Sequence, residues 1–464
     1  MKLQDLIVAA NRLPIRQTLD ADGKLSWSTS PGGLASALTP VMQKADSVVW
    51  VGWPGNNAEE GLERFSSDGI DLIPINMSVN EIEAHYEGMS NGTLWPLYHD
   101  KVVNAVFHRR WFDAYKKINE RFAHSIIPLV SADSTVWVND YQLQLVPKMI
   151  RSVKPEAKIG FFLHTPFPPP ELFKQLPWRE EIIQGLLGCN LIGMQTPNDA
   201  DNFLLTVKDL GLGTITDSVI HHDRGTTEIE AFPIGIDFDT YADAAKTKET
   251  AERADQIRSL LGNPKTVILG VDRLDYTKGI EIRLRAYKEL LEESRLDPAT
   301  VAMVQVATPS RNNVRAYDKI RSEVEQAVGN INGRFAKLGR LPIHYLGQDQ
   351  NFSELLGLYR AADMMLVTPF KDGMNLVAME YAATKYDNTG SLILSEFAGA
   401  AYICDGALTV NPYAINELKD AIMESIRMPE AAKLRRMEIL RDSVKRNDVN
   451  QWAESFVGAL SKAG

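Results

Sequence analysis

The segment at residues 266–284, TVILGVDRLDYTKGIEIRL, constrains the fold most, because a strand pattern leads into a helix pattern across one short polar turn. The apolar run at 267–271 is typical of a buried strand, and a helical period begins near Gly279. Arg273 and Lys278 fall in the turn between them. A helix N-terminus carries unpaired N–H groups and partial positive charge, so two cations there indicate a phosphate or diphosphate site.

The same two cations have a purely structural alternative. They would then pair on the surface with Asp272 and Asp275, in an ordinary strand–turn–helix unit. Loops that follow the strands of α/β proteins often carry ligands, so this turn alone leaves both interpretations open.

Length and composition indicate an ordinary globular protein with more than one domain. A chain of 464 residues exceeds what one hydrophobic core usually holds, and 44% hydrophobic and 24% charged residues are average values. The net charge of -10 argues against a general nucleic-acid-binding protein, which would present a basic face. No apolar stretch has the length of a membrane span, and no signal peptide is recognisable. Cys189 and Cys404 lie far apart in apolar settings, which is typical of reduced thiols in a cytoplasmic protein.

Strand patterns alternate with helix patterns along the chain, which predicts βαβ units and parallel sheets. Predicted strands of the first half cover residues 5–10, 48–53, 135–139, 158–163 and 191–194, with helices at 35–42, 141–153 and 179–187. Predicted strands of the second half cover 267–271, 302–307, 343–346, 364–368 and 391–394, with helices at 240–263 and 376–384.

This pattern predicts an α/β fold with two doubly wound Rossmann-like domains and the active site in the cleft between them. We place the N-terminal domain at residues 1–235 and the C-terminal domain at 236–464. The last helix, at about 445–464, is amphipathic around Trp452 and Phe456 and is a candidate to pack back on the N-terminal domain.

Polar side chains follow several predicted strands at the point where each strand ends. Arg12, Asp140 and His164 do so in the first half, and Arg311 in the second. A single histidine at such a position is more often structural than catalytic. Three functional side-chain types that converge on one sheet edge favour a binding site there.

A second helix start, in the segment Asp372-Gly373-Met374-Asn375, again directs N–H groups outward. Glu380 lies in the second turn of the helix that follows, within reach of a ribose, although it could equally be an ordinary helix carboxylate. The glycine pair that ends at Gly33 precedes the helix predicted at 35–42 and would let a ligand approach the backbone closely.

Three segments resemble metal-ligand patterns. Residues 199–201 and 237–239 have the Asp-x-Asp pattern of metal-dependent transferases, and His221-His222-Asp223 falls in a polar stretch that we interpret as a loop. Acidic residues are expected at a helix start in any case, so we predict no metal and no other cofactor.

Nine motifs resemble, in order and over nearly the whole chain, those of the trehalose-6-phosphate synthases. They are ANRLP (10–14), PGGL (31–34), WVGW (50–53), YEG (86–88), LWP (94–96), DYQL (140–143), GFFLH (160–164), VDRLDYTKG (271–279) and DGMNLVA (372–378). Asn139 and Met379 depart from the family pattern, since some members have His at the first position and a basic residue is common at the second. Cys404-Asp405 also replaces a more usual polar segment.

The resemblance implies a retaining glycosyltransferase that moves glucose from a nucleotide diphosphate glucose, usually UDP-glucose, to glucose 6-phosphate. It implies a donor site formed by Gly33, Arg273, Lys278, Asp372, Gly373, Met374, Asn375, Leu376, Val377 and Glu380. It implies an acceptor site formed by Arg12, Tyr86, Trp95, Asp140 and Arg311. Asp140, His164, Arg273 and Lys278 would be the catalytic residues. A nucleotide-sugar donor and a sugar-phosphate acceptor are thus the implied partners, with no nucleic acid or membrane, and a homo-oligomer stays open.

Two alternatives remain at this point. A related transferase would use another phosphorylated acceptor, such as glycerol 3-phosphate or a cyclitol phosphate. A non-catalytic homologue would bind sugar phosphates and regulate a partner. A nicotinamide dehydrogenase is disfavoured because no strand leads into a Gly-x-Gly-x-x-Gly turn.

Overall fold

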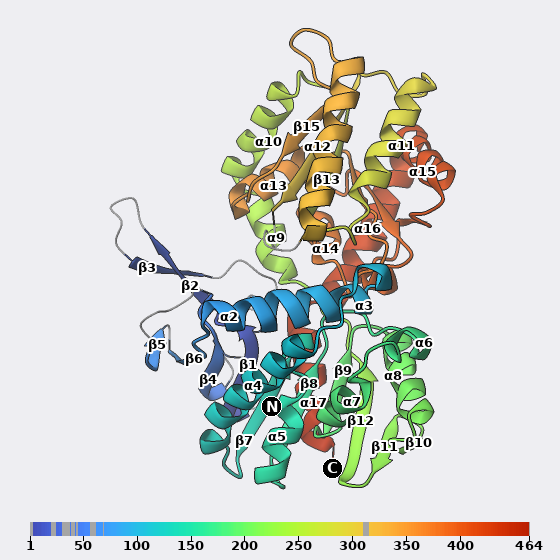
Figure 1. The fold of residues 1–464 in the computed structure, drawn as a ribbon. Helices are drawn as coiled ribbons and strands as arrows, with labels where there is room; N and C mark the ends of the chain where they lie inside the picture. Colours follow the sequence, from blue (N-terminus) through green and yellow to red (C-terminus); the bar gives the residue numbers. More distant parts are fainter. Residues whose placement is uncertain are drawn as a thin grey trace. The chain divides into compact units, whose positions relative to one another are not determined.

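The computed structural model describes residues 3–19, 25–29, 38, 42, 45–55, 62–67, 69–309 and 315–463. The chain divides into two compact units (Figure 1). Unit 1 comprises Met1–Phe232 and Asn450–Gly464, and unit 2 comprises Pro233–Val449. The chain therefore crosses from unit 1 to unit 2 after Phe232 and returns to unit 1 after Val449.

Unit 1 is built on a mixed sheet in which the described residues form ten strands, in the order β10-β11-β12-β9-β8-β7-β1-β4-β6-β5. The parallel strands are β1 (Leu3–Arg12), β4 (Ala45–Trp53), β6 (Ile70–Pro74), β7 (Ser134–Asn139), β8 (Lys158–Phe162), β9 (Leu191–Met194) and β12 (Gly225–Ala231). β4 and β6 lie on one side of β1, and β7, β8 and β9 on the other. The strand order therefore reverses at β1, and parallel sheets bind ligands at the carboxyl ends of the strands beside such a reversal.

Antiparallel strands extend this sheet, and the sequence pattern did not reveal them. β10 (Thr214–Thr216) and β11 (Val219–His222) precede β12, β5 (Phe65–Ser67) pairs with β6, and β2 (Ile15–Leu19) forms a separate hairpin with β3 (Leu25–Thr29). The interpretation of residues 221–223 as a polar loop was therefore wrong, since His221 and His222 belong to β11. β11 lies between β10 and β12, and its two histidines break the apolar pattern that would indicate a strand.

In unit 1 the helices predicted at 179–187 and at the C-terminal end are present, whereas the long helix at 109–126 was not predicted. The helices of this unit are α2 (Val79–Glu81), η1 (Ile82–Leu94), α3 (Trp95–Tyr98), α4 (Arg109–Ile126), α5 (Val146–Val153), α6 (Pro170–Phe173), α7 (Arg179–Leu186), α8 (Pro197–Asp209) and α17 (Val449–Lys462). The helix predicted at 141–153 starts only at Val146, after a short 3₁₀ turn, because Asp140 has a positive φ of 73°. η1 is a π-helix of 13 residues, which no sequence pattern indicated. The helix predicted at 35–42 lies mostly outside the described residues.

The C-terminal helix α17 packs on the sheet of unit 1 (Figure 1, red helix beside β8 and β9). The Phe456 ring stacks on Trp137 with 4.6 Å between centroids, and Trp452 meets Phe162 edge-on at 5.1 Å. Gly160 and Gly193 make this approach possible, because a Cβ at either position would lie 2.7 Å from an α17 side-chain atom.

Unit 2 is built on a parallel sheet in which the described residues form six strands, in the order β15-β14-β13-β16-β17-β18. They are β13 (Thr266–Arg273), β14 (Val301–Thr308), β15 (Ile343–Leu346), β16 (Met364–Val367), β17 (Ser391–Ser395) and β18 (Leu408–Val410). Numbered from its own first strand, this order is 3-2-1-4-5-6, and the parallel strands β6-β4-β1-β7-β8-β9 of unit 1 have the same order. Both units are thus doubly wound Rossmann-like folds, as predicted, although the sequence shows no repeat.

Helices cover the sheet of unit 2. They are α9 (Phe238–Ala245), α10 (Lys248–Leu260), α11 (Ile280–Glu292), α12 (Arg315–Phe335), α13 (Phe352–Ala361), α14 (Leu376–Thr384), α15 (Ile415–Arg427) and α16 (Glu430–Arg446). The single helix predicted at 240–263 is two helices, because the Thr247 side chain accepts from the Thr250 amide and starts α10 anew. Ile268, Leu284 and Val324 lie in the buried core between the sheet, α11 and α12.

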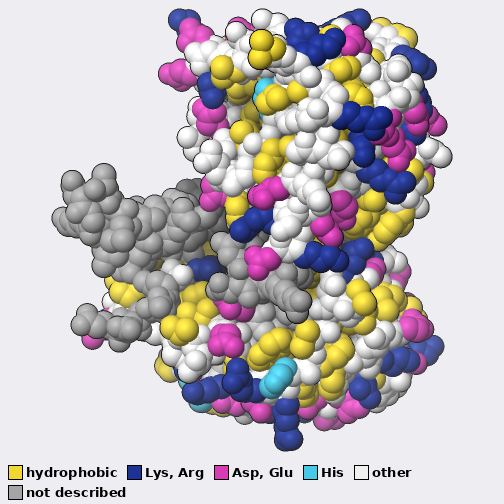
Figure 2. All heavy atoms as spheres, turned by 45° about the horizontal axis from the view of Figure 1, so that its top comes forward, with side chains coloured by type: hydrophobic (Ala, Val, Ile, Leu, Met, Phe, Trp, Pro, Cys, Tyr) yellow, Lys and Arg dark blue, Asp and Glu magenta, His cyan; other side chains and the backbone are white. Residues whose placement is uncertain are grey.

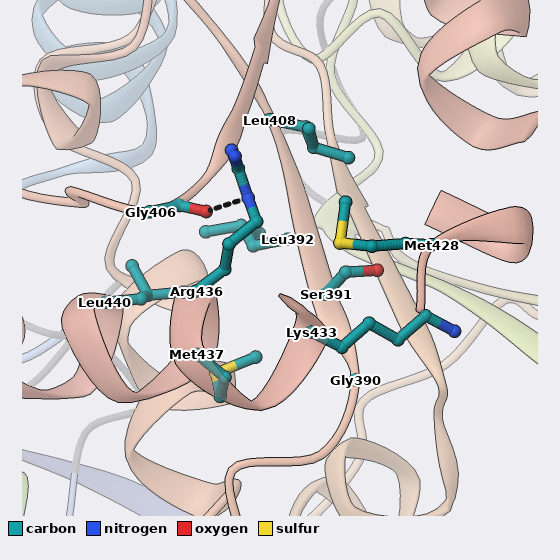
Figure 3. A pocket seen from close by; sticks show the side chains of 10 residues that line it. All are labelled: Gly390, Ser391, Leu392, Gly406, Leu408, Met428, Lys433, Arg436, Met437 and Leu440. Atoms are coloured by element: carbon teal, nitrogen blue, oxygen red, sulfur yellow. Dashed lines mark hydrogen bonds between the residues drawn. The ribbon is translucent and has the colours of Figure 1, made fainter. Parts of the chain in front are cut away.

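A cavity of about 10 Å³ lies in unit 2 between β17, β18 and α16 (Figure 3). Arg436 of α16 closes one side by donating from Nε to the Gly406 carbonyl at 3.0 Å. This volume suits one water molecule, and its lining includes no predicted site residue.

Acidic and basic side chains are interspersed on the face shown in Figure 2. None of the helices that the structure describes is both long enough and apolar enough to cross a membrane. Cys189 and Cys404 are buried free thiols, as the sequence predicted.

Candidate active site

The turn after β13 begins helix α11 at the carboxyl edge of the unit 2 sheet. Gly279 is the N-cap residue and has a φ of 62°, which glycine adopts without strain. A Cβ at this position would lie 2.2 Å from the carbonyl oxygen of Thr368, directly after β16. Glycine thus lets α11 start against the end of β16 and brings Lys278 to the point where the strand order reverses.

Lys278 makes an ion pair at this edge. Its Nζ lies 2.5 Å from Oδ2 of Asp372, and the two side chains are only 10% and 12% exposed. Asn375 donates from Nδ2 to the same oxygen at 2.9 Å. The structure therefore brings together three of the predicted donor residues. Arg273 is exposed at the end of β13, five residues before Lys278.

The fully buried guanidinium of Arg283 stabilises this turn through hydrogen bonds. Arg283 of α11 donates to Asp272 at 2.6 Å, to Gln305 Oε1 at 3.2 Å, to Thr368 Oγ1 at 3.1 Å and to the Lys278 carbonyl at 3.2 Å. Burial raises the pKa of Asp272, and the Arg283 charge opposes that change. One side chain thus connects the ends of β13, β14 and β16 with the Lys278 backbone.

The alternative of surface pairing through Asp272 and Asp275 is wrong, because both carboxylates are buried. Asp275 accepts from the Thr277 amide and hydroxyl, each at 2.9 Å, and from Tyr317 Oη at 2.8 Å. It therefore shapes the turn that carries Lys278.

The start of α14 forms the other wall of this site. Asn375 is the N-cap residue and has a φ of 78°, which a non-glycine side chain adopts only when its surroundings enforce it. Gly373 and Met374 precede it in the buried loop, and Leu376 and Val377 open the helix half-buried. The first amides of a helix lack intrahelical partners, so those of Leu376 and Val377 are available as donors.

Glu380 lies one turn further along α14. Its Oε2 accepts from Tyr359 Oη at 2.7 Å, and Tyr241 also bonds to it. Burial raises the pKa of Glu380, against the effect of these hydrogen bonds. A carboxylate has about four acceptor positions, so these two hydrogen bonds do not saturate it. Met379 beside it is fully buried in the core.

In unit 1, Arg12 ends β1 and stacks on two aromatic rings. Its guanidinium carbon lies 3.9 Å from the centroid of Trp53 and 5.5 Å from that of Tyr86. A Cβ at Gly55, whose φ is 95°, would lie 2.0 Å from Arg12 Nη1. Arg12 and Tyr86 are predicted site residues that the structure brings together, whereas sequence reasoning missed Trp53 and Gly55. The motif WVGWPG contained the signal, because Trp53 ends strand β4 and Gly55 follows two residues later.

Asp140 and His164 meet at the ends of β7 and β8. The backbone N–H of His164 donates to Asp140 Oδ1 at 3.2 Å, and the positive φ of Asp140 marks an enforced backbone conformation. Burial lowers the pKa of His164 to about 3, so the imidazole is neutral at physiological pH. Asn139 Oδ1 lies 3.2 Å from His164 Nε2. Sequence reasoning noted Asn139 as a departure but gave it no role.

Trp95 is buried beside these residues. Its ring lies 4.0 Å from that of His99 and 5.8 Å from that of Tyr141, the residue after Asp140. Two predicted residues, Gly33 and Arg311, lie outside the described residues.

The metal-ligand candidates have structural roles. Asp199 accepts from the Phe167 amide at 2.9 Å and the Thr196 hydroxyl at 2.6 Å, and Asp237 caps α9 by accepting from the Thr240 amide at 3.1 Å. The described part of the chain contains no cluster of three or more His, Cys, Asp or Glu side chains that could hold a metal ion.

Comparison with known proteins assigns the family. The model of glycosyltransferase family 20 matches residues 4–462. A trehalose-6-phosphate synthase from Mycolicibacterium gilvum is 46% identical over 98% of this chain and 93% of its own, and one from Mycobacterium tuberculosis H37Rv is 46% identical over 99% and 95%. Among solved structures, an E. coli protein bound with UDP-2-fluoro glucose superposes with a TM-score of 0.90 at 33% identity, covering 98% of this chain and 99% of its own. A UDP-forming α,α-trehalose-phosphate synthase from Burkholderia xenovorans, in complex with glucose-6-phosphate, gives a TM-score of 0.90 at 32% identity over 99% and 100%. The chain therefore belongs to glycosyltransferase family 20 and is a glycosyltransferase of the trehalose-6-phosphate synthase type.

Proposed function

We propose that this enzyme transfers glucose from UDP-glucose to glucose 6-phosphate, with retention of the anomeric configuration, and forms α,α-trehalose 6-phosphate. The observation that carries the proposal is the pairing of Lys278 with Asp372 at the carboxyl edge of the unit 2 sheet. Such an ammonium, held at a helix N-terminus, suits a diphosphate leaving group. The UDP-2-fluoro glucose of the E. coli neighbour and the glucose-6-phosphate of the B. xenovorans neighbour support the choice of substrates.

The donor binds to unit 2 in this proposal. Arg273 and Lys278 hold the diphosphate, assisted by the backbone at Gly33. Asp372 and the backbone of residues 373–377 face the glucose, and Glu380 accepts from the ribose hydroxyls.

The acceptor binds to unit 1. The Arg12 fork holds the phosphate of glucose 6-phosphate, together with Tyr86, Trp95 and Arg311. Trp53 orients the guanidinium by stacking on it. Asp140 accepts from an acceptor hydroxyl, and His164 contacts the transferred sugar.

The reaction breaks the bond between the anomeric carbon and the diphosphate oxygen and joins that carbon to the acceptor oxygen. Negative charge develops on the departing diphosphate, so Arg273 and Lys278 stabilise the transition state more than the ground state. Retention follows from attack on the leaving-group face, where a donor phosphate oxygen takes the acceptor proton. A retaining glycosidase would need two carboxylates about 5–5.5 Å apart across the anomeric carbon, and Asp140 is the single carboxylate that this proposal places beside the acceptor.

The test is release of UDP from UDP-glucose, followed with and without glucose 6-phosphate. The proposal requires release that depends on the acceptor and saturates with it. Glycerol 3-phosphate and a cyclitol phosphate serve as competing acceptors, and faster release with either would assign another substrate. Binding of both sugars without release would indicate a regulator.

A further inference from the structure

Asn139, the last residue of β7, makes two kinds of contact at once. Its side chain is fully buried. Nδ2 faces two backbone carbonyls, that of Trp137 at 3.2 Å and that of Ala9 at 3.4 Å, while Oδ1 lies 3.2 Å from Nε2 of His164.

These contacts fix the orientation of the Asn139 amide. A backbone carbonyl only accepts hydrogen bonds, so the side that faces Ala9 and Trp137 has to be the NH₂ group. The opposite orientation would place the amide oxygen against two carbonyl oxygens. Oδ1 therefore points to His164.

The amide orientation in turn fixes the tautomer of His164. An amide oxygen cannot donate, so Nε2 of the imidazole carries the proton and donates to Asn139. The ring stays neutral because Phe162 and Trp452 enclose it, at centroid distances of 4.7 and 6.1 Å, and burial lowers its pKa to about 3. Asp140 is the charged group beside it, and its Oδ1 contacts the His164 backbone N–H. Nδ1 is left as an acceptor with a lone pair.

We propose that Asn139 is a positioning residue that holds His164 in the Nε2–H tautomer, so that Nδ1 accepts a hydrogen bond from a hydroxyl of the transferred sugar. The tautomer follows from the contacts above, and only the identity of the hydroxyl donor rests on the proposed function. Helix α17 contributes the Trp452 ring that lies beside the imidazole.

The test is ¹⁵N NMR of the full chain labelled at histidine, without substrate, with the His164→Gln spectrum to assign the signal. The wild-type protein should show protonated Nε2 and unprotonated Nδ1 at every pH from 5 to 8. In Asn139→Ala no amide oxygen accepts from Nε2, so the tautomer of His164 is no longer fixed. Part of the His164 signal should then show a protonated Nδ1, and turnover should fall with the fraction of rings that lose the Nε2–H tautomer.

Asn351→Ala is the matched control, because Asn351 is an exposed N-cap residue of α13 in unit 2, whereas His164 belongs to unit 1. It should change neither the His164 signal nor turnover. A wild-type ring protonated on Nδ1, or a folded Asn139→Ala in which every His164 ring keeps its proton on Nε2, would overturn the proposal. Because this spectrum needs no substrate, a failure of the proposed glucosyl transfer would leave its result intact.

Discussion

Lys278 Nζ lies 2.5 Å from Asp372 Oδ2, which joins the loops that follow β13 and β16. The pair is nearly buried, and Asn375 shares the same carboxylate oxygen. Asp372 therefore holds the ammonium at the sheet edge, where the proposed function places the diphosphate of the donor. This kind of preorganisation favours developing charge on a leaving group.

We expect Lys278→Ala to reduce kcat/KM with UDP-glucose by about 100-fold or more, because a charge-assisted hydrogen bond contributes about 1.5–3 kcal/mol and more where water is excluded. Steady-state kinetics of UDP release measures this change. Lys319→Ala is the control, since Lys319 is 78% exposed on α12 and pairs with Glu323 one turn further along the helix. Near-normal kcat/KM in Lys278→Ala would remove the diphosphate assignment.

Arg12→Ala should raise KM for glucose 6-phosphate far more than KM for UDP-glucose. The guanidinium can bind the phosphate with two parallel N–H groups while it stacks on Trp53. Arg12→Lys keeps the charge but loses the planar guanidinium and its stacking on Trp53. We therefore expect its KM for glucose 6-phosphate to lie between that of the wild type and that of Arg12→Ala. Equal losses for both substrates would contradict an acceptor role.

Arg283→Leu should destabilise unit 2 by about 3–5 kcal/mol, because it leaves the buried Asp272 without its cation. Urea denaturation measures the free energy of unfolding. The double variant Asp272→Asn, Arg283→Leu should recover part of this loss, since no unpaired charge remains. A double variant as unstable as the sum of the single variants would show that the ion pair does not couple these two residues.

Glu81 should make unit 1 sensitive to acid. Burial would raise its pKa, but the hydrogen bonds from Arg121, Ser78 and Lys117 lower it to about 2. The folded state therefore favours the carboxylate, and this stability is fully present above pH 4.5 and is lost as the pH falls toward 2. The Glu81→Gln variant should show a shallower loss of stability across that window. An unchanged slope would mean that the hydrogen bonds from Arg121, Ser78 and Lys117 do not stabilise the ionised Glu81 in the folded state.

Gly193→Ala should loosen α17 from the sheet. The added Cβ would lie 2.7 Å from Phe456, and overpacking of this kind destabilises by about 1–3 kcal/mol. Gly458→Ala, within α17 itself, is the matched control, because nothing lies within 4 Å of its Cβ and alanine favours a helix. A loss of stability in Gly458→Ala and none in Gly193→Ala would contradict the close packing of α17 on the sheet at Gly193.

The fold was predictable from sequence where strands are buried on both faces. The run before Arg273 and the strand at 364–367 were placed within a residue or two, because continuous apolar runs between turn residues have few other interpretations. The π-helix η1 and the antiparallel strands near His221 were not predicted. Their conformation depends on tertiary contacts, which the local hydrophobic periodicity of the sequence does not encode.

The candidate site was predictable as a set of residues, but its internal contacts were not. Lys278, Asp372 and Asn375 lie up to 97 positions apart, and only the fold shows that one carboxylate oxygen serves the other two side chains. The roles of Trp53 and Asn139 likewise appear only once β4 lies beside β1 and β7 beside β8.

The most direct test of the proposed glucosyl transfer is ¹H NMR of the product made from UDP-glucose and glucose 6-phosphate. The proposal predicts a 1,1-linked disaccharide phosphate with both anomeric centres in the α configuration, formed in step with UDP release. A β-configured centre, or no disaccharide while UDP is released, would contradict it.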